Sequence, residues 1–168
     1  RNLRLSNVKT CTVAGFPLGA SHWSLIVKEA VRAVKDGSQE IDFVAPIPIL
    51  LDDKPINTAG LGNVCVGERF FRILLTAIRK INPNVVTKVI LETAALYDES
   101  FSIYEGRINN SCWAASSAGC DFVKTSTGFH PAGGATIYAV EMMSKYCSKV
   151  PTRLQVKASG GIRTYQDA

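Results

Sequence analysis

Residues 118–129 read AGCDFVKTSTGF, and the segment DFVKTSTG at 121–128 is a short apolar run that ends in a lysine, three hydroxyl residues and a glycine. The run is rich in strand-forming residues and too short for a helical pattern, so it predicts a buried strand that ends at Lys124. An isolated lysine in this place ordinarily extends its ammonium group into solvent. In a cavity, by contrast, burial favours the neutral amine, which attacks carbonyl groups. The rest of the chain decides between these two interpretations.

Strands and helices are expected to alternate along the whole chain. Strand composition recurs at 8–16, 40–45, 87–91 and 153–157, and helical spacing is found at 21–34, 70–81, 98–117 and 136–146. This alternation predicts parallel strands joined by helical crossovers within one domain over 1–168. The segment 50–67 is irregular and glycine-rich, so we expect a surface loop or insertion there.

Two α/β architectures fit this alternation, an open doubly wound sheet and a (β/α)8 TIM barrel. No G-x-G-x-x-G pattern follows the first expected strand, so the dinucleotide-binding fingerprint of the doubly wound fold is absent. Charged residues instead lie on or at the ends of otherwise apolar strands, namely Asp42, Lys88, Lys124 and Lys157. A barrel explains them, because its strand ends surround one shared site. We therefore expect the TIM barrel.

Composition argues against several other functions. The formal net charge is +5, but the 19 basic residues are scattered singly, which disfavours nucleic-acid binding. No apolar stretch approaches the roughly 20 residues that span a bilayer, so we expect a soluble, cytoplasmic protein without membrane contact. His22 and His130 have no metal-ligand spacing and are expected at the surface or at helix caps. Of the five cysteines, Cys11 and Cys120 are expected to be core residues.

The charged residues form a set that is suited to carbonyl chemistry. Lys124 and Lys157 are one strand–helix unit apart, so we expect them on adjacent strands, where each ammonium group disfavours the charge of the other. Asp42 is a carboxylate that can transfer protons, either directly or through a water. Gly160 and Gly161 follow a strand, where backbone N–H groups can approach an anion, and a short helix after them would add its dipole. The set suits Schiff-base chemistry on a phosphate-bearing substrate.

Four segments in sequence order carry a family resemblance. They are EIDFVAPI (40–47), TKVILET (87–93), AGCDFVKTSTGF (118–129) and VKASGGIRTYQDA (156–168). Together they resemble deoxyribose-phosphate aldolase, the class I aldolase family of the (β/α)8 fold. The resemblance runs from Lys9 to Ala168.

The resemblance implies a reaction and a role for each matched residue. Lys124 matches the Schiff-base lysine, Lys157 a second lysine that lowers its pKa, Asp42 the proton-relay aspartate and Lys88 a lysine near the same cavity. Positions around the substrate phosphate match Gly128, Gly160 and Gly161. The implied reaction is the reversible cleavage of 2-deoxy-D-ribose 5-phosphate to acetaldehyde and D-glyceraldehyde 3-phosphate. No metal or organic cofactor is implied, and a homo-oligomer, a dimer, is expected.

The sequence also departs from the family pattern. In alignment it covers about the third to the seventh barrel strand, so we expect an incomplete barrel that is truncated at both ends. Ala94 and Ala95 stand where many members have Gly-Glu, and the stretch 52–67 is longer than usual. A non-catalytic relative that acts in binding or assembly therefore stands as the alternative to a working aldolase.

Overall fold

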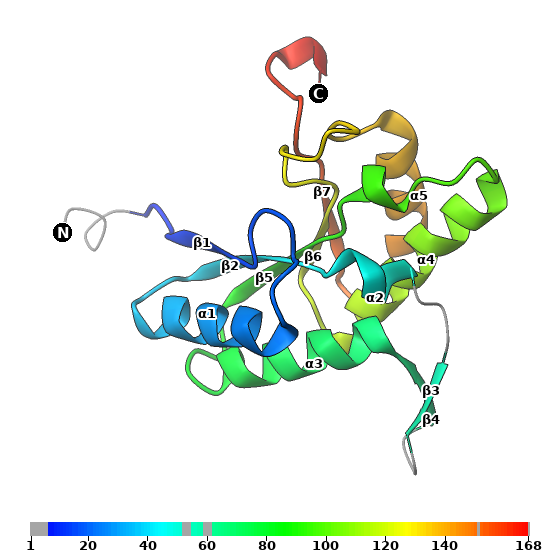
Figure 1. Ribbon diagram of the computed structural model, residues 1–168. Helices are drawn as coiled ribbons and strands as arrows, with labels where there is room; N and C mark the ends of the chain where they lie inside the picture. The colour runs from blue at the N-terminus through cyan, green and yellow to red at the C-terminus, as the bar shows by residue number, and fades with distance from the viewer. Residues whose placement is uncertain (1–6, 52–54, 59–61, 151, 168) are drawn as a thin grey trace.

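A five-stranded parallel sheet forms the centre of the computed structural model, which describes residues 7–51, 55–58, 62–150 and 152–167 (Figure 1). Its strands are β1 (Cys11–Ala14), β2 (Glu40–Val44), β5 (Val86–Ile90), β6 (Phe122–Lys124) and β7 (Gln155–Lys157). The order in the sheet is β1-β2-β5-β6-β7, so each of these strands lies beside the next one in the chain. A doubly wound sheet reverses its strand order, whereas a barrel keeps it. The expectation of a partial (β/α)8 barrel is thus confirmed.

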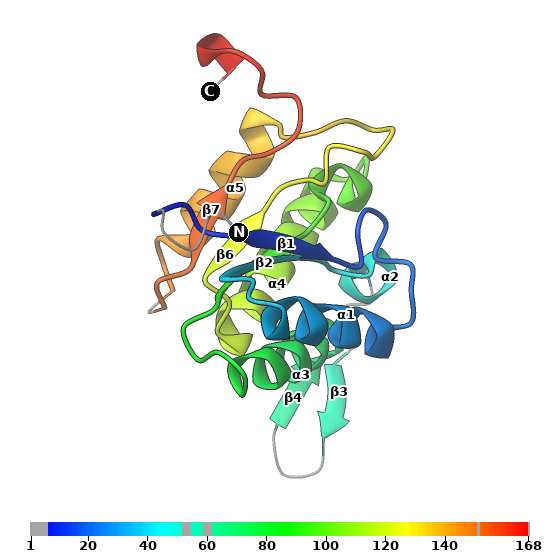
Figure 2. The ribbon, with the colours of Figure 1, turned by 90° about the vertical axis from the view of Figure 1, so that its left-hand side faces the viewer.

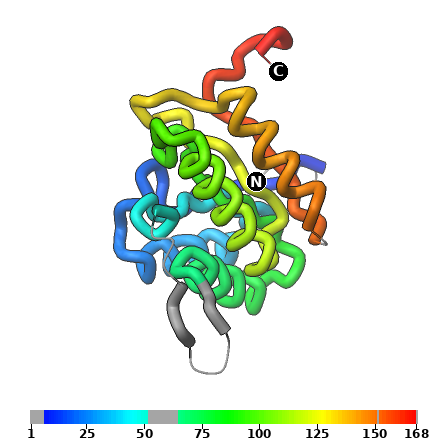
Figure 3. The backbone as a smooth tube through the Cα atoms, turned by 90° about the vertical axis from the view of Figure 1, so that its right-hand side faces the viewer, coloured from blue at the N-terminus to red at the C-terminus, as the bar shows by residue number. Residues whose placement is uncertain are grey.

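The main helices form one layer against the sheet. The helices are α1 (Trp23–Lys35), α2 (Ile47–Leu51), α3 (Val66–Arg79), α4 (Phe101–Ala118) and α5 (Ile137–Cys147), with short 3-10 segments η2 (Thr93–Leu96) and η3 (Tyr165–Asp167). Helix α1 packs on α3, α3 on α4 and α4 on α5, as Figures 2 and 3 show from opposite sides. Successive crossovers therefore cover the same face of the sheet, as they do around a barrel.

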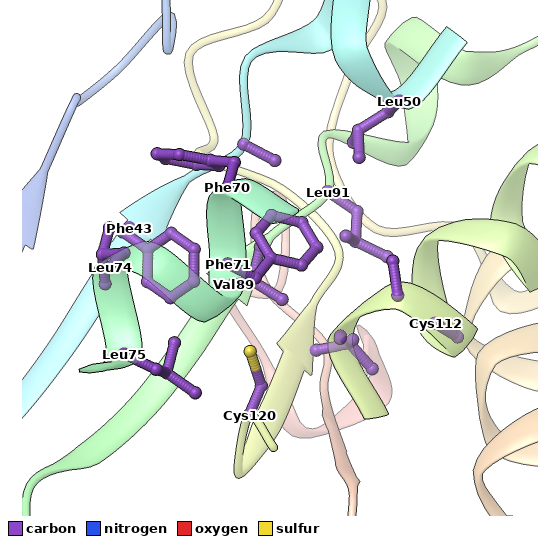
Figure 4. Packing of buried hydrophobic residues seen from close by; sticks show 14 of the residues in the cluster. Phe43, Leu50, Phe70, Phe71, Leu74, Leu75, Val89, Leu91, Cys112 and Cys120 are labelled. Atoms are coloured by element: carbon purple, nitrogen blue, oxygen red, sulfur yellow. The ribbon is translucent and has the colours of Figure 1, made fainter. Parts of the chain in front are cut away.

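The core lies between this helix layer and one face of the sheet (Figure 4). Alternate strand residues point to opposite faces, so Ile41 and Phe43 of β2 face the helices. The Phe43 ring lies 6.1 Å from that of Phe70 and 5.7 Å from that of Phe71, both on α3. All four side chains are buried in one hydrophobic cluster. The intervening residues of the strands are consequently turned away from the helices.

The ends of the helices follow local capping chemistry. His22 caps α1, because its Nδ1 accepts from the N–H of Ser24 at 3.3 Å, which fits the expected capping role. Thr136 caps α5 by accepting from the N–H of Ala139 at 3.1 Å. Helix α4 ends at Gly119, whose φ of 85° suits glycine. Helix α3 begins four residues before the expected 70, and the Cys65 thiol accepts from its third N–H.

The segment 50–67 differs from the expected irregular loop. It contains the antiparallel hairpin of β3 (Pro55–Thr58) and β4 (Gly62–Cys65), in which Asn57 pairs with Asn63. The hairpin projects away from the five-stranded sheet in Figures 1 and 2. Residues 52–54 and 59–61 lie outside the described residues. Glycine and proline are common in both loops and hairpin turns, and for this reason the composition did not reveal the pairing of β3 with β4.

Among the described residues, no helix combines the length and the apolar character that crossing a membrane requires.

Candidate active site

The sheet face opposite the helices carries a row of charged side chains. Because side chains alternate along a strand, Glu40 and Asp42 of β2 emerge on this face together with Lys88, Lys124 and Lys157 of the next three strands. Asp42 is in register with Lys88, and Lys124 is in register with Lys157. The expectation that Lys124 and Lys157 lie on adjacent strands is confirmed.

The Asp42 carboxylate is the point at which these side chains meet. Its Oδ1 accepts from Lys88 Nζ at 2.7 Å, and its Oδ2 accepts from Lys124 Nζ at 2.9 Å. Lys157 Nζ lies 3.7 Å from the same Oδ2. The Asp42 side chain is 4% exposed, whereas that of Lys124 is 13% exposed and that of Lys157 43% exposed. Three lysine Nζ atoms thus approach one buried carboxylate, and two of them approach a single oxygen.

A second carboxylate extends the network. Lys88 Nζ also donates to Glu40 Oε2 at 2.7 Å, so Lys88 lies between two acidic groups. The Cys11 thiol donates to Asp42 Oδ1 at 3.2 Å. Cys11 is exposed and lies on the charged face, so the expectation that it belongs to the core is wrong, whereas Cys120 is buried as expected. Successive residues of β1 point to opposite faces of the sheet, so a difference of one position decides whether Cys11 faces the core or the charged cluster.

The hydrogen bonds of the network hold Asp42 and Lys88 in their charged forms. Burial raises the pKa of Asp42, but the hydrogen bonds from Lys88 and Lys124 outweigh burial and lower the pKa to about 2. Burial lowers the pKa of Lys88, but the hydrogen bonds to Asp42 and Glu40 outweigh it and raise the pKa above its ordinary value. Asp42 is consequently a carboxylate, and Lys88 an ammonium group, throughout the neutral range.

The turn that follows Lys124 is tied to the neighbouring strand end. The Thr125 N–H donates to the Lys157 carbonyl at 3.1 Å, and the Thr125 hydroxyl donates to the Ser159 carbonyl at 3.0 Å. The Ser159 hydroxyl in turn donates to the Ser126 carbonyl at 2.6 Å. These bonds join the end of β6 to the segment after β7, which contains the glycine pair.

Three glycines meet beside this turn. Gly128 and Gly160 have φ of 83° and 86°, and a Cβ on Gly160 would lie 3.3 Å from the Cα of Gly128. A Cβ on Gly134 would lie 2.2 Å from the Gly160 carbonyl oxygen, so only glycine fits there. Within the described ranges, the N–H groups of Gly128, Gly160 and Gly161 donate no backbone hydrogen bond. The expected short helix after Gly161 is only the three-residue η3, too short to supply a helix dipole.

The structure also contains site features that sequence reasoning missed. Ser159 and Glu92 each contact the turn after Lys124, and Gly134 contacts Gly160, but none of the three was singled out. Gly134 lies in a glycine-rich stretch, which was a usable signal, whereas nothing in the composition marks Glu92. Among the described residues, no group of three or more His, Cys, Asp or Glu side chains is placed to hold a metal ion.

The chain is similar to known proteins over nearly its whole length. The chain is 42% identical to deoxyribose-phosphate aldolase of Corynebacterium diphtheriae over 166 residues, which cover 96% of the chain and 64% of the relative. It is 43% identical to the enzyme of the same name from Caldanaerobacter subterraneus, covering 99% of the chain and 63% of the relative. The chain belongs to the deoxyribose-phosphate aldolase family. No protein-family model matches it.

Solved structures of aldolases share the fold. The aldolase QR15 superposes with a TM-score of 0.73 at 36% identity, and the match covers 96% of the chain and 62% of QR15. The deoxyribose-phosphate aldolase of Aeropyrum pernix, described as tetrameric, gives a TM-score of 0.73 at 29% identity over 96% of the chain and 58% of that protein. The chain spans slightly less than two thirds of the length of these aldolases.

The stability of the fold should depend on the charge of Asp42. The folded-state pKa of about 2 lies below the ordinary aspartate value, so its stabilisation is present above about pH 4 and lost as the pH falls toward 2. A shift of this size corresponds to about 2 kcal/mol. Urea unfolding between pH 5 and pH 2 should show a smaller loss of stability, by about that amount, in Asp42→Asn than in the unaltered chain.

Asp36→Asn is the matched control for this experiment. Asp36 pairs with Arg32 at 2.8 Å, but both side chains are more than half exposed, and exposed pairs of this kind contribute little. The variant should therefore keep the acid dependence of the unaltered chain. An identical acid dependence in Asp42→Asn and in the unaltered chain would contradict the network.

The contact between Gly134 and Gly160 should tolerate no added methyl group. In Gly134→Ala the Cβ meets the Gly160 carbonyl, so the loop must shift, and we expect a loss of about 1–3 kcal/mol in the free energy of unfolding. Gly106→Ala is the control, because a Cβ on Gly106 in α4 meets nothing within 4 Å. It should raise stability by about 0.5–1 kcal/mol. Equal effects of the two substitutions in urea unfolding would refute the close approach.

Proposed function

We propose that this chain provides the catalytic centre of a Schiff-base aldolase acting on 2-deoxy-D-ribose 5-phosphate. The observation that carries the proposal is the convergence of Lys124 and Lys157 on the buried carboxylate of Asp42. The names of the curated relatives support the same substrate. The reversible reaction yields acetaldehyde and D-glyceraldehyde 3-phosphate.

The first step joins the substrate to Lys124. The neutral amine attacks the C1 aldehyde of the open-chain sugar, and uptake of one proton with loss of water leaves a positively charged imine. The proposal places Lys157 beside this lysine as its electrostatic neighbour, because the Nζ atoms of Lys124 and Lys157 lie 2.9 Å and 3.7 Å from the same Asp42 oxygen. Lys157 is the more exposed of the two lysines.

The imine then accepts the electrons of the bond that breaks. As the C2–C3 bond cleaves, its electron pair forms an enamine on Lys124, and the C3 hydroxyl loses its proton to become the aldehyde of D-glyceraldehyde 3-phosphate. Protonation of the enamine at C2 and addition of water release acetaldehyde and restore the amine. The imine is the only electron sink that this sequence of steps requires, so the proposal includes no metal or organic cofactor.

Asp42 is proposed to relay protons during these steps. With a pKa of about 2 it is a weak base, so we assign it to orienting a water that carries the proton rather than to holding the proton itself. Its bonds to Lys88 and Lys124 fix the carboxylate in place for this role. Lys88 forms ion pairs with both Asp42 and Glu40 and so compensates the negative charge of the buried Asp42 carboxylate.

The phosphate of the substrate is assigned to the glycines next to this cluster. Backbone N–H groups at Gly128, Gly160 and Gly161 can approach an anion without obstruction by side chains. Gly128 lies in the turn after Lys124, and the glycine pair follows Lys157 by three residues. A sugar phosphate bound in this way extends from the lysines to the glycines.

Cellular location and assembly are part of the proposal. The five cysteines are free thiols, which suits the reducing cytoplasm. Large apolar side chains such as Tyr97 and Phe101 are 65% and 61% exposed, and such exposure favours contact between subunits. We propose a homodimer, which sedimentation velocity should detect as a species of twice the chain mass. A monomer at every concentration would contradict it.

Trapping with borohydride tests the chemistry directly. Reduction in the presence of acetaldehyde should leave an ethyl group on Lys124, located by peptide mass spectrometry, because borohydride reduces the imine to a stable amine. Lys124→Arg should abolish the label, and Lys145→Arg, a change at an exposed lysine of α5, should leave it intact. A folded chain that shows no label, or a label on another lysine, would favour the non-catalytic alternative of a binding or assembly protein.

A further inference from the structure

Glu92 is a buried acidic residue that the proposed reaction leaves without a role. It follows β5 by two residues, and only 2% of it is exposed. Its backbone has φ 52° and ψ 60°, the left-handed conformation that residues other than glycine rarely adopt. It is the only non-glycine residue with positive φ in the described part of the chain. Such backbone strain concentrates at functional sites.

The Glu92 carboxylate is directed at the turn that follows Lys124. Its Oε2 accepts from the Thr127 N–H at 3.1 Å and from the Thr127 hydroxyl at 2.5 Å. None of the salt bridges found among the described residues includes Glu92. A buried carboxylate must be compensated by donors, and here one residue of the turn supplies both an amide and a hydroxyl donor.

Thr127 links the Glu92 carboxylate to Gly128 and Phe129. Its hydroxyl donates to Glu92 and accepts from the Phe129 N–H at 3.1 Å. The two bonds enclose Gly128, whose φ is 83° and whose Cα faces Gly160. The carboxylate therefore determines how Gly128 presents its N–H beside the glycine pair.

The other bonds to this segment do not replace Glu92. Thr125 and Ser126 are held by Lys157 and Ser159, which lie on the β7 side. On the β5 side, the Thr93 N–H donates to the Thr125 carbonyl at 2.9 Å. Among the hydrogen bonds that the structure describes, those to the Glu92 side chain are the only ones that join Thr127 to the β5 side.

We propose that Glu92 is a positioning residue that holds the turn of residues 127–129 ready for the phosphate-bearing end of the substrate. It acts through Thr127 and determines the preference for phosphorylated over neutral sugars. The inference rests on the proposed function, because it assumes that the phosphate binds at the glycines.

The experiment compares two substitutions, each of which changes one partner of the contact between Glu92 and Thr127. Glu92→Gln keeps the shape of the side chain and one acceptor oxygen, but its bonds from Thr127 lose the negative charge that strengthens them. Thr127→Val keeps the shape and removes the hydroxyl. Glu99→Gln is the matched control, because Glu99 lies exposed in the same connection between β5 and α4.

The first measurement is the borohydride labelling of Lys124 with 2-deoxyribose and with 2-deoxyribose 5-phosphate. The ratio of the two half-labelling concentrations gives the preference for the phosphate. We expect Glu92→Gln and Thr127→Val each to lower this preference about tenfold, the effect of one lost charge-assisted hydrogen bond. The double variant should lower the phosphate preference no further than either single variant, since both changes act on the same contact between Glu92 and Thr127. Glu99→Gln should keep the preference.

The second measurement needs no substrate. Amide hydrogen exchange of Thr127 and Phe129 should be about tenfold faster in Glu92→Gln, while that of Val123 in β6 should stay unchanged. Unchanged exchange at Thr127 and Phe129, or an unchanged phosphate preference in a chain that is labelled at Lys124, would overturn the inference. Absence of label in the unaltered chain would instead refute the proposed function, and the exchange result would still decide the role of Glu92.

Discussion

The buried carboxylate of Asp42 is the constraint on which the site depends. A charge that is 4% exposed is stable only when donors surround it, and the side chains of Lys88, Lys124 and Lys157 supply these donors. The lysines reach it from three consecutive strands beyond β2, so the charge network exists only when β2, β5, β6 and β7 are paired in register. Folding of the sheet and assembly of the site are therefore one event.

One face of the strands packs the core, and the opposite face carries the candidate site. Residues such as Phe43 and Val89 pack against the helices, while their neighbours Asp42 and Lys88 point the other way. This alternation places an apolar core one residue away from a polar cluster on each strand. A one-residue slip in register would bury the charges under the helices and expose the aromatic rings. The core thereby enforces the geometry of the site.

The segments after β6 and β7 show a different kind of constraint. Their backbones approach so closely that side chains are excluded at Gly134 and Gly160, and hydroxyl groups of Thr125 and Ser159 hold the contact together. Glu92 adds a buried charge on the other side of the same turn. Backbone geometry near Lys124 is thus determined by side chains from both neighbouring strand ends, and this suits the proposed binding of a phosphate in one orientation.

The sequence by itself determined the alternation of strands and helices, the order of the strands, and the charged set of Asp42, Lys88, Lys124 and Lys157. These features could be predicted because they depend on local composition, on the two-residue period of strands and on the spacing of units along the chain. Only the tertiary structure decided the hairpin of β3 and β4, the exposed position of Cys11 and the contact of Glu92 with Thr127. Each of these depends on which segments approach one another in space, and this information is not present in the local residue pattern.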